Sequence, residues 1–158
     1  MSPSASGSAA ASLAKSLALA FMPAVVGVPT VARERYAHLS KPRWAPPPTV
    51  FGPVWTALYT SLGVASWMVH RQGQESVQAK RWYVAQLGLN ALWTPLFFGA
   101  GRRGAALVDI VAMWFGALGT VRSFYRVRHA AGVLLLPYLG WITFATALNA
   151  AIWWRNRD

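Results

Sequence analysis

Cysteine is absent from the 158 residues, and the chain holds only four acidic residues. Without a thiolate it can form no disulfide, no cysteine nucleophile and no cysteine-ligated zinc or iron–sulfur centre. Only 12% of the residues are charged and 55% are hydrophobic, whereas ordinary soluble domains are roughly 25% charged. This composition argues against a water-soluble globular domain.

Long apolar segments fill most of the chain. Five segments that are nearly or wholly uncharged approach or exceed the roughly 17 to 25 residues that a membrane-spanning helix needs. They are residues 16–32, 45–69, 82–100, 104–121 and 130–154. A soluble chain of this length would have no amphipathic shell left to cover five such helices. The sequence therefore predicts an all-α integral membrane bundle of five transmembrane helices.

The polar segments define the expected domain organisation. Residues 1–12 are small and polar and predict a disordered tail, which leaves residues 13–158 as a single five-helix transmembrane domain. The expected connections are 33–48, 70–81, 99–104 and 122–129. The first is the longest and ends in three prolines, which suit an extended entry into a helix. The short connections predict antiparallel neighbouring helices.

The formal net charge of +11 is compatible with two kinds of partner, nucleic acid and anionic lipid. Because the basic residues are dispersed among connections on both expected faces, the sequence favours lipid headgroups and no nucleic acid. Seven lysines and arginines fall on one face and eight on the other, so the positive-inside rule gives no orientation. The three histidines fall in expected connections, and we therefore expect no metal site.

Polar and aromatic side chains recur at helical spacing in three segments. Asn90 and Trp93 are three residues apart, and Trp55 and Tyr59 are four apart. A stripe in the last segment contains Tyr138, Trp141, Ala145 and Asn149. Such stripes are more often packing than pocket, but indole and phenol groups facing inward on several helices can also line an apolar cavity. The residues alone leave these alternatives open.

Two stripes of small residues predict close helix packing: Ala57, Ser61 and Ala65, and Ala112, Gly116 and Thr120. We expect internal packing for the first and leave a homodimer open for the second. Asp109 is the only acid within an expected span. It is expected near the start of its helix, where solvent, Arg102 or Arg103 would stabilise the charge, and a role in proton transfer is the less favoured alternative.

Three motifs carry a family resemblance. They are KPRWAPPPTVFGPVWTALYTSLGVASW at 41–67, QLGLNALWTPLFFGAGRRGAALVD at 86–109 and PYLGWITFATALNAAIWW at 137–154. In this order, and with nine tryptophans in the chain, they resemble the TspO/translocator protein family, also called tryptophan-rich sensory proteins or peripheral benzodiazepine receptors. The resemblance covers about residues 19–155.

The resemblance implies a homodimeric five-helix bundle with a cavity beneath the long first connection. It implies porphyrins, sterols and isoquinoline or benzodiazepine-type drugs as ligands. By motif position, the family's pocket residues correspond to Trp55, Asn90, Trp93, Trp141, Phe144 and Ala145, and its fourth-helix acid corresponds to Asp109. With Tyr59 and Tyr138 added from the stripes, these form the predicted ligand-binding set, and Lys41, Trp44, Pro46 and Pro47 form the predicted lid.

One departure concerns sterols. The sterol-recognition pattern of animal members requires a tyrosine in the last helix, but Ala150 stands there between Leu148 and Arg155. A looser match at Val121, Tyr125 and Arg128 carries little weight. The chain therefore looks nearer to bacterial members, which predicts a bacterial membrane, or the mitochondrial outer membrane for a eukaryotic chain.

The sequence-based hypothesis is a membrane sensor or translocator that binds a porphyrin, protoporphyrin IX or haem, without an obligatory cofactor. The ligand would enter beneath Pro46–Pro48, stack on Trp55 and Trp141 and meet Asn90. Arg35, Lys41 or Arg43 would pair with a propionate. Two alternatives stay open: a transporter of tetrapyrrole or lipid, and a light- and oxygen-dependent porphyrin-degrading enzyme with Trp55 and Trp141 as its candidate catalytic residues.

Overall fold

The computed structural model describes residues 3–26, 29–73 and 77–157. Within these ranges the chain forms helices and no strand. In order they are α1 (Pro3–Val26), α2 (Pro29–Ala37), α3 (Pro48–His70), α4 (Val77–Thr94), the π-helical turn η1 (Pro95–Gly99), α5 (Arg103–Val127), α6 (His129–Leu134) and α7 (Leu136–Arg155). The predicted all-α fold is confirmed.

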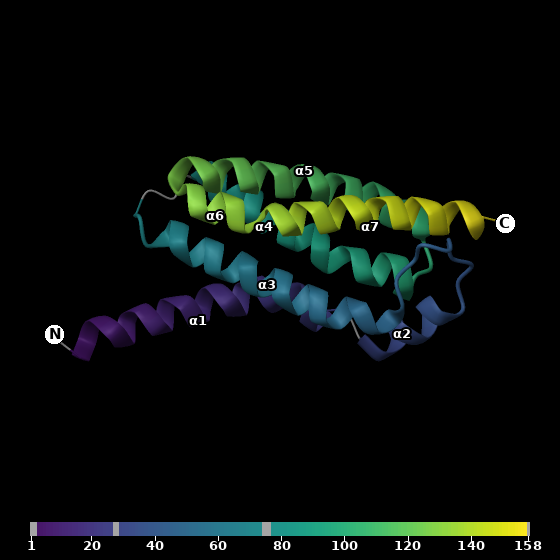
Figure 1. The fold of residues 1–158 in the computed structure, drawn as a ribbon, viewed down its shortest axis with the longest axis horizontal. Helices are drawn as coiled ribbons and strands as arrows, with labels where there is room; N and C mark the ends of the chain where they lie inside the picture. The colour runs from purple at the N-terminus through teal and green to yellow at the C-terminus, as the bar shows by residue number, and fades with distance from the viewer. Residues whose placement is uncertain (1–2, 27–28, 74–76, 158) are drawn as a thin grey trace.

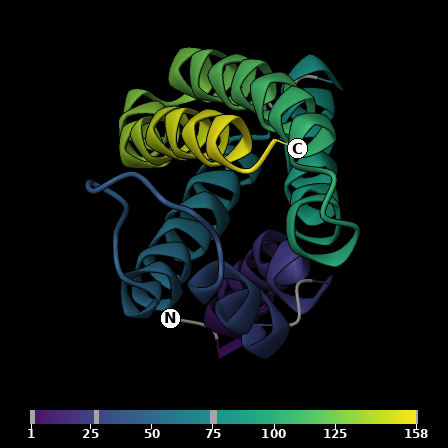
Figure 2. The ribbon, with the colours of Figure 1, turned by 90° about the vertical axis from the view of Figure 1, so that its right-hand side faces the viewer.

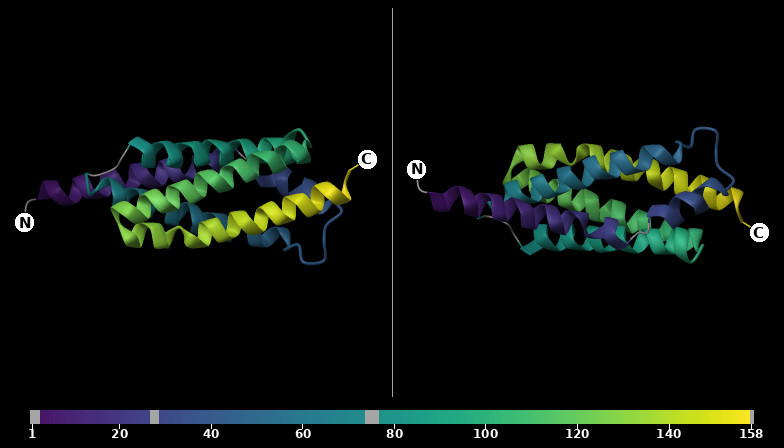
Figure 3. Two further views of the ribbon diagram at one scale, coloured as in Figure 1. Left: turned by 90° about the horizontal axis from the view of Figure 1, so that it is seen from above. Right: turned by 90° about the horizontal axis from the view of Figure 1, so that it is seen from below.

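The long helices form a closed ring (Figures 1 and 2). α1 packs against α3 and α4, α4 packs against α5, α5 packs against α6 and α7, and α6 returns to α3. Because α3 contacts α6 more extensively than it contacts α7, the ring is closed tightly at one end and loosely at the other. The short helix α2 lies at the loosely packed end, where it contacts η1 and α3, and Figure 3 shows it at the same end of the bundle as the C-terminus.

The first helix differs from the prediction at both ends. Residues 3–12, predicted as a disordered tail, form the start of α1, and the Trp67 indole donates a hydrogen bond to Ser12 Oγ at 3.1 Å. Alanine has the highest intrinsic helix propensity, which a reading based on hydropathy overlooks. The predicted span 16–32 is also wrong at its end, because α1 stops at Val26 and Pro29 begins α2. Proline fits the first position of a helix, because the N–H group that it lacks would have no partner within the helix there.

Three connections are shorter than predicted because charged residues continue the helices. α4 begins at Val77 inside the predicted second connection, and α5 extends through Val127 in the predicted fourth. Only Arg128, with φ −150° and ψ 112°, breaks the chain between α5 and α6. Helix α2 likewise occupies part of the first connection. Charged side chains are good helix formers once they face water, so helices extend beyond the apolar segments.

A proline changes the geometry at the end of α4. Pro95 lacks the N–H that an α-helix needs, and the following turn widens into η1, where the Ala100 N–H bonds to the Pro95 carbonyl at 2.8 Å. Gly101, with φ 64°, then allows the tight turn into α5. This turn places Phe97 and Phe98 beside the other helices.

The described residues contain three helical segments long and apolar enough to cross a membrane: Gly7–Val26, Arg103–Val127 and His129–Arg155. Their outer faces expose large apolar side chains such as Val25, Val108 and Phe115, as expected for contact with lipid. α3 and α4 run beside these segments in the same bundle (Figure 1). The chain is an all-α membrane bundle, and the count of five spans stays a prediction.

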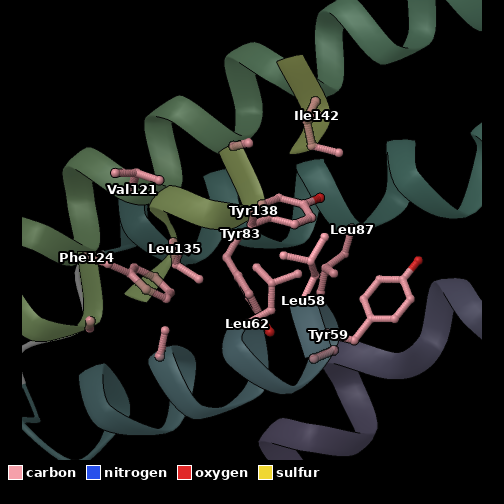
Figure 4. Close-up of a cluster of buried hydrophobic side chains, with 14 of the residues drawn as sticks. Leu58, Tyr59, Leu62, Tyr83, Leu87, Val121, Phe124, Leu135, Tyr138 and Ile142 are labelled. Carbon is pink, nitrogen blue, oxygen red and sulfur yellow. The ribbon is translucent and has the colours of Figure 1, made fainter. Parts of the chain in front are cut away.

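The main core lies where α3, α4, α5 and α7 meet (Figure 4). Leu62, Tyr83 and Tyr138 are at most 2% exposed at its centre, and the Tyr83 and Phe124 rings lie 5.6 Å apart. A second, smaller core contains Tyr36, Phe97 and Ile152 at the end near α2. The two cores fix the positions of the helices that surround the space between them.

Small residues make the closest helix contacts. A Cβ at Gly63 of α3 would lie 2.9 Å from the Cα of Leu17 in α1, and a Cβ at Gly116 of α5 would lie 2.9 Å from the Cβ of Gln86 in α4. Gly116 and Thr120 are buried within the chain, whereas Ala57 and Ala112 are exposed. The second small-residue stripe, left open as a dimer surface, therefore forms an internal seam at Gly116 and Thr120.

We predict that Gly63→Ala lowers the melting temperature, because the new methyl group forces α1 and α3 apart at a cost of about 1–3 kcal/mol. Gly140→Ala is the matched control, because a Cβ there meets no atom within 4 Å. It should leave stability unchanged or raise it slightly. Thermal unfolding in detergent, followed by circular dichroism, measures both; equal melting temperatures would contradict the proposed contact.

Candidate ligand-binding cavity

A cavity of about 470 Å³ lies at the loosely packed end of the bundle, between α1, α2, α3, α4, η1 and α7. This volume falls within the roughly 300–1,000 Å³ of typical small-molecule sites. Its lining consists of Phe21, Pro23, Ala24, Ala32, Tyr36, Pro48, Thr49, Phe51, Gly52, Trp55, Thr56, Tyr59, Asn90, Trp93, Thr94, Phe97, Phe98, Trp141, Ala145, Leu148, Asn149 and Ile152. The wall is mainly apolar, with a few polar side chains.

Aromatic rings form a continuous row along the cavity. Trp55 stacks on Tyr59 at 5.3 Å and meets Trp141 edge-on at 6.4 Å. Phe51, one helical turn before Trp55, also meets Trp141 edge-on, at 6.0 Å. On the opposite wall, Trp93 stacks on Phe97 at 4.9 Å. Offset and edge-on pairs are favourable ring geometries, and they hold the indole faces in fixed orientations.

Hydrogen bonds join the polar groups of three helices at the inner end of the cavity. The Tyr59 hydroxyl donates to Asn90 Oδ1 at 2.8 Å, and Asn90 Nδ2 donates to the Tyr138 hydroxyl at 3.2 Å. Tyr138 in turn donates to Gln86 Oε1 at 2.5 Å. Away from water, an unpaired polar group costs several kcal/mol, so this network also fixes the register of α3, α4 and α7.

A second hydrogen-bonded link holds the opposite wall. The Trp93 indole donates to Asn149 Oδ1 at 2.9 Å, and Asn149 Nδ2 donates to the Arg103 carbonyl at 3.1 Å. The indole of Trp141 differs, because its Nε1 is buried without a hydrogen-bond partner in the described part of the chain. Trp141 therefore brings an unused donor to the cavity wall.

The segment that covers the cavity is fixed at both ends. Lys41 Nζ donates to the carbonyls of Tyr36, Ala37 and Leu39 at 2.8–3.0 Å and so caps α2. The Tyr36 hydroxyl donates to the Pro46 carbonyl at 3.1 Å, and burial raises the pKa of Tyr36 above its usual value of 10.0. Ser40 and Asn156 exchange two hydrogen bonds, at 3.0 and 2.9 Å.

Comparison with known proteins places this bundle in a family. The model of the TspO/MBR family matches residues 12–155. The chain belongs to the TspO/MBR family. It is 42% identical to the translocator protein of Homo sapiens over 125 residues, which are 77% of this chain and 74% of the relative. It is 43% identical to the tryptophan-rich sensory protein of Cereibacter sphaeroides over 133 residues, 84% of each chain.

A third relative is archaeal. The tryptophan-rich protein TspO of Archaeoglobus fulgidus is 43% identical over 122 residues, which are 77% of this chain and 79% of the relative. Because the identities to the human, bacterial and archaeal proteins are nearly equal, the overall identity does not separate bacterial from animal members. The resemblance inferred from the three motifs is confirmed, and this TspO/MBR protein is a membrane protein of the sensor or translocator type.

Six of the eight residues predicted to bind a ligand line the cavity of this TspO/MBR protein: Trp55, Tyr59, Asn90, Trp93, Trp141 and Ala145. The other two, Tyr138 and Phe144, lie behind the wall. Tyr138 is 1% exposed and supports Asn90, whereas Phe144 packs against Trp141 at 5.2 Å between ring centres. Helical spacing correctly indicates the inward face of each helix, but it does not show which inward side chains reach the cavity.

The predicted lid residues belong to the covering segment, but they do not line the cavity. Trp44 meets the Phe144 ring edge-on at 5.7 Å, and Pro47 precedes α3 in an extended conformation. Lys41 is engaged by the carbonyls of α2, and Arg35 donates to the carbonyls of Phe98 and Gly99. The expected pairing of Lys41 or Arg35 with a propionate therefore competes with bonds that these side chains already make.

Sequence reasoning missed the phenylalanines of the wall and misjudged one acid. Phe51 is four residues before Trp55 and shares its face, so helical spacing could have identified it. Phe97 and Phe98 depend on the turn at Pro95, which spacing does not reveal. Asp109, expected near solvent or paired with Arg102 or Arg103, is 6% exposed, and neither carboxylate oxygen has a partner in the described residues. It lies too far into α5 for either arrangement.

We predict that Tyr138→Phe destabilises the bundle by about 1 kcal/mol, because it removes the hydroxyl that joins Asn90 to Gln86. Tyr125→Phe is the matched control, since Tyr125 is 45% exposed and lies outside this network. Thermal unfolding in detergent compares the two. If both variants unfold at the wild-type temperature, the network does not stabilise the bundle.

We also predict that Asn156→Ala loosens the covering segment. Loss of the two bonds to Ser40 should speed hydrogen exchange of the amides in residues 39–45 about tenfold. Hydrogen–deuterium exchange with mass spectrometry measures this rate, and the exposed neighbour Arg155→Ala serves as the control. Unchanged exchange in Asn156→Ala would mean that other contacts hold the segment.

Proposed function

We propose that this TspO/MBR protein binds porphyrins and related planar hydrophobic ligands in the tryptophan-lined cavity. Burial of a planar apolar face against indole rings provides about 25 cal/mol for each Å² removed from water. The rings of Trp55, Trp93 and Trp141 come from three different helices. A flat ligand between them would contact aromatic surface on more than one side.

One observation carries the proposal: Trp141 lines this apolar cavity, and its buried Nε1 has no hydrogen-bond partner among the described residues. Buried donors are nearly always hydrogen-bonded, so an unused donor on a side chain of the cavity wall suits an acceptor on a ligand. Asn90 is a weaker candidate for this contact than sequence suggested, because Tyr59 and Tyr138 already engage its amide. The ligand's polar edge is therefore assigned to Trp141, and stacking is assigned to Trp55.

We predict that Trp141→Phe weakens protoporphyrin IX binding about fivefold to tenfold, because it removes a buried hydrogen bond and keeps most of the ring surface. Titration of the detergent-held protein in the dark, followed by tryptophan quenching, gives the dissociation constant. Trp154→Phe is the matched control, since Trp154 is 66% exposed and lies outside the cavity. Equal dissociation constants for the two variants would contradict the proposed contact.

Two further measurements, porphyrin absorbance under light and porphyrin movement across a sealed vesicle, separate the remaining functions. Porphyrin absorbance that falls only under light and beyond a protein-free control would favour the degrading enzyme, with Trp55 and Trp141 beside the ligand. Movement of porphyrin across a sealed vesicle would favour a transporter. Saturable binding without either effect is the result expected for a sensor. Isoquinoline or benzodiazepine-type drugs are expected to compete for this cavity, whereas Ala150 leaves the sterol-recognition pattern incomplete, and a homodimer stays a prediction of the family.

A further inference from the structure

Phe97 and Phe98 line both the cavity and a second, smaller hollow. This hollow has a volume of about 290 Å³, and its remaining lining residues are Arg35, His38, Leu39, Gly101, Arg103 and Asn156. They come from α2, from the turn between η1 and α5, and from the C-terminal end of α7. The hollow is therefore a separate site at the same end of the bundle as the cavity.

The electrostatic character of the hollow is positive. Among the described residues, two arginines and a histidine line it, and no carboxylate does. Arg103 is also the first residue of α5, where the positive end of the helix dipole disfavours a cation. A basic side chain at this position is unfavourable unless an anion lies nearby, so the local charges favour a negatively charged ligand.

Unused donors point to the same chemistry. Arg103 Nε is buried without a hydrogen-bond partner in the described part of the chain. Arg35 uses Nη1 for the carbonyls of Phe98 and Gly99, and within the described residues its Nε and Nη2 donors stay available to a ligand. A partly buried guanidinium without an acidic partner is costly, and a phosphate oxygen accepts from such planar donors in pairs.

The site lies close to the expected water interface. The Trp153 indole approaches the start of α5, with Nε1 3.1 Å from the position of a Cβ on Gly104. Arg157 lies over the rings of Trp153 and Trp154, at 5.0 and 3.4 Å from their centres. Tryptophan and arginine gather at the depth of lipid headgroups. A phospholipid phosphate is thus available at the level of the hollow.

We propose that the hollow between α2, the η1–α5 turn and α7 binds a phosphate group through Arg35 and Arg103. The group comes either from a phospholipid headgroup or from soluble phosphate, since both present the same oxygens. This site does not rest on the proposed function of the cavity. An occupied hollow would stabilise Phe97 and Phe98 from behind and so support the cavity wall.

The test measures binding of dioleoylphosphatidylglycerol and of inorganic phosphate to the full-length protein in a neutral detergent. Native mass spectrometry counts bound lipid, and thermal unfolding with added phosphate reports the soluble anion. The variant is Arg103→Gln, because Arg103 Nε makes no hydrogen bond in the described structure whose loss would unfold the protein. Arg122→Gln, an exposed arginine at the far end of α5, is the matched control.

We predict that Arg103→Gln weakens binding about tenfold, because it removes a charged, planar donor. Arg122→Gln should change the dissociation constant by less than twofold. Arg103→Lys keeps the charge but loses the planar pair of donors, so its dissociation constant should lie between those of the two glutamine variants. Lipid binding without an effect of inorganic phosphate identifies the headgroup as the source, and stabilisation by phosphate alone identifies the soluble anion.

Equal binding by Arg103→Gln and Arg122→Gln would overturn the proposal, as would an absence of binding to the wild-type protein. Circular dichroism confirms that each variant is folded. Protoporphyrin titration of Arg103→Gln keeps the two sites distinguishable, because loss of phosphate binding with retained porphyrin binding affects only this proposal. Failure of porphyrin binding in the wild-type protein would affect only the cavity.

Discussion

The structure depends on a hydrogen-bond network in an apolar interior. Tyr59, Asn90, Tyr138 and Gln86 join α3, α4 and α7 where neither water nor lipid can satisfy their polar groups. Each of these helices must keep its register for the network to form. Because lipid provides no strong hydrophobic force between helices, such bonds and close contacts at small residues decide which helices meet.

The cavity follows from where this network lies. Toward the tightly packed end, the helices pack around Leu62 and Tyr83. Toward the loosely packed end, near α2, the row of aromatic rings from Trp55 to Trp141 borders the open cavity. The proline at the end of α4 widens the chain into η1, and Lys41 and Asn156 hold the covering segment in place. The wall is therefore supported from three sides while its interior stays open to a ligand.

Much of this architecture was predictable from the sequence. The apolar segments identify an all-α membrane bundle because helix length in a membrane is set by its thickness. The stripes identify the inward faces of three helices, and the motifs place Trp55, Asn90 and Trp141 at one site. Helical periodicity carries this information directly, since residues three and four apart share a face.

The rest depends on interactions between distant segments. Alanine-rich residues 3–12 are polar enough to suggest a tail, yet they form helix and pack on α3 through Ser12. The apolar count does not show that Tyr138 supports Asn90 from behind, or that Lys41 faces carbonyls of its own segment. The burial of Asp109 depends on which face of α5 turns inward. These outcomes depend on tertiary contacts, which no local pattern contains.

We propose the tryptophan-lined cavity as the ligand site of this TspO/MBR protein. An experimental structure determined with protoporphyrin IX in the dark tests it most directly. We expect porphyrin density between Trp55 and Trp141, with the Trp141 indole donating to the ligand. Density confined to the lipid-facing surface, with the cavity unchanged, would contradict it.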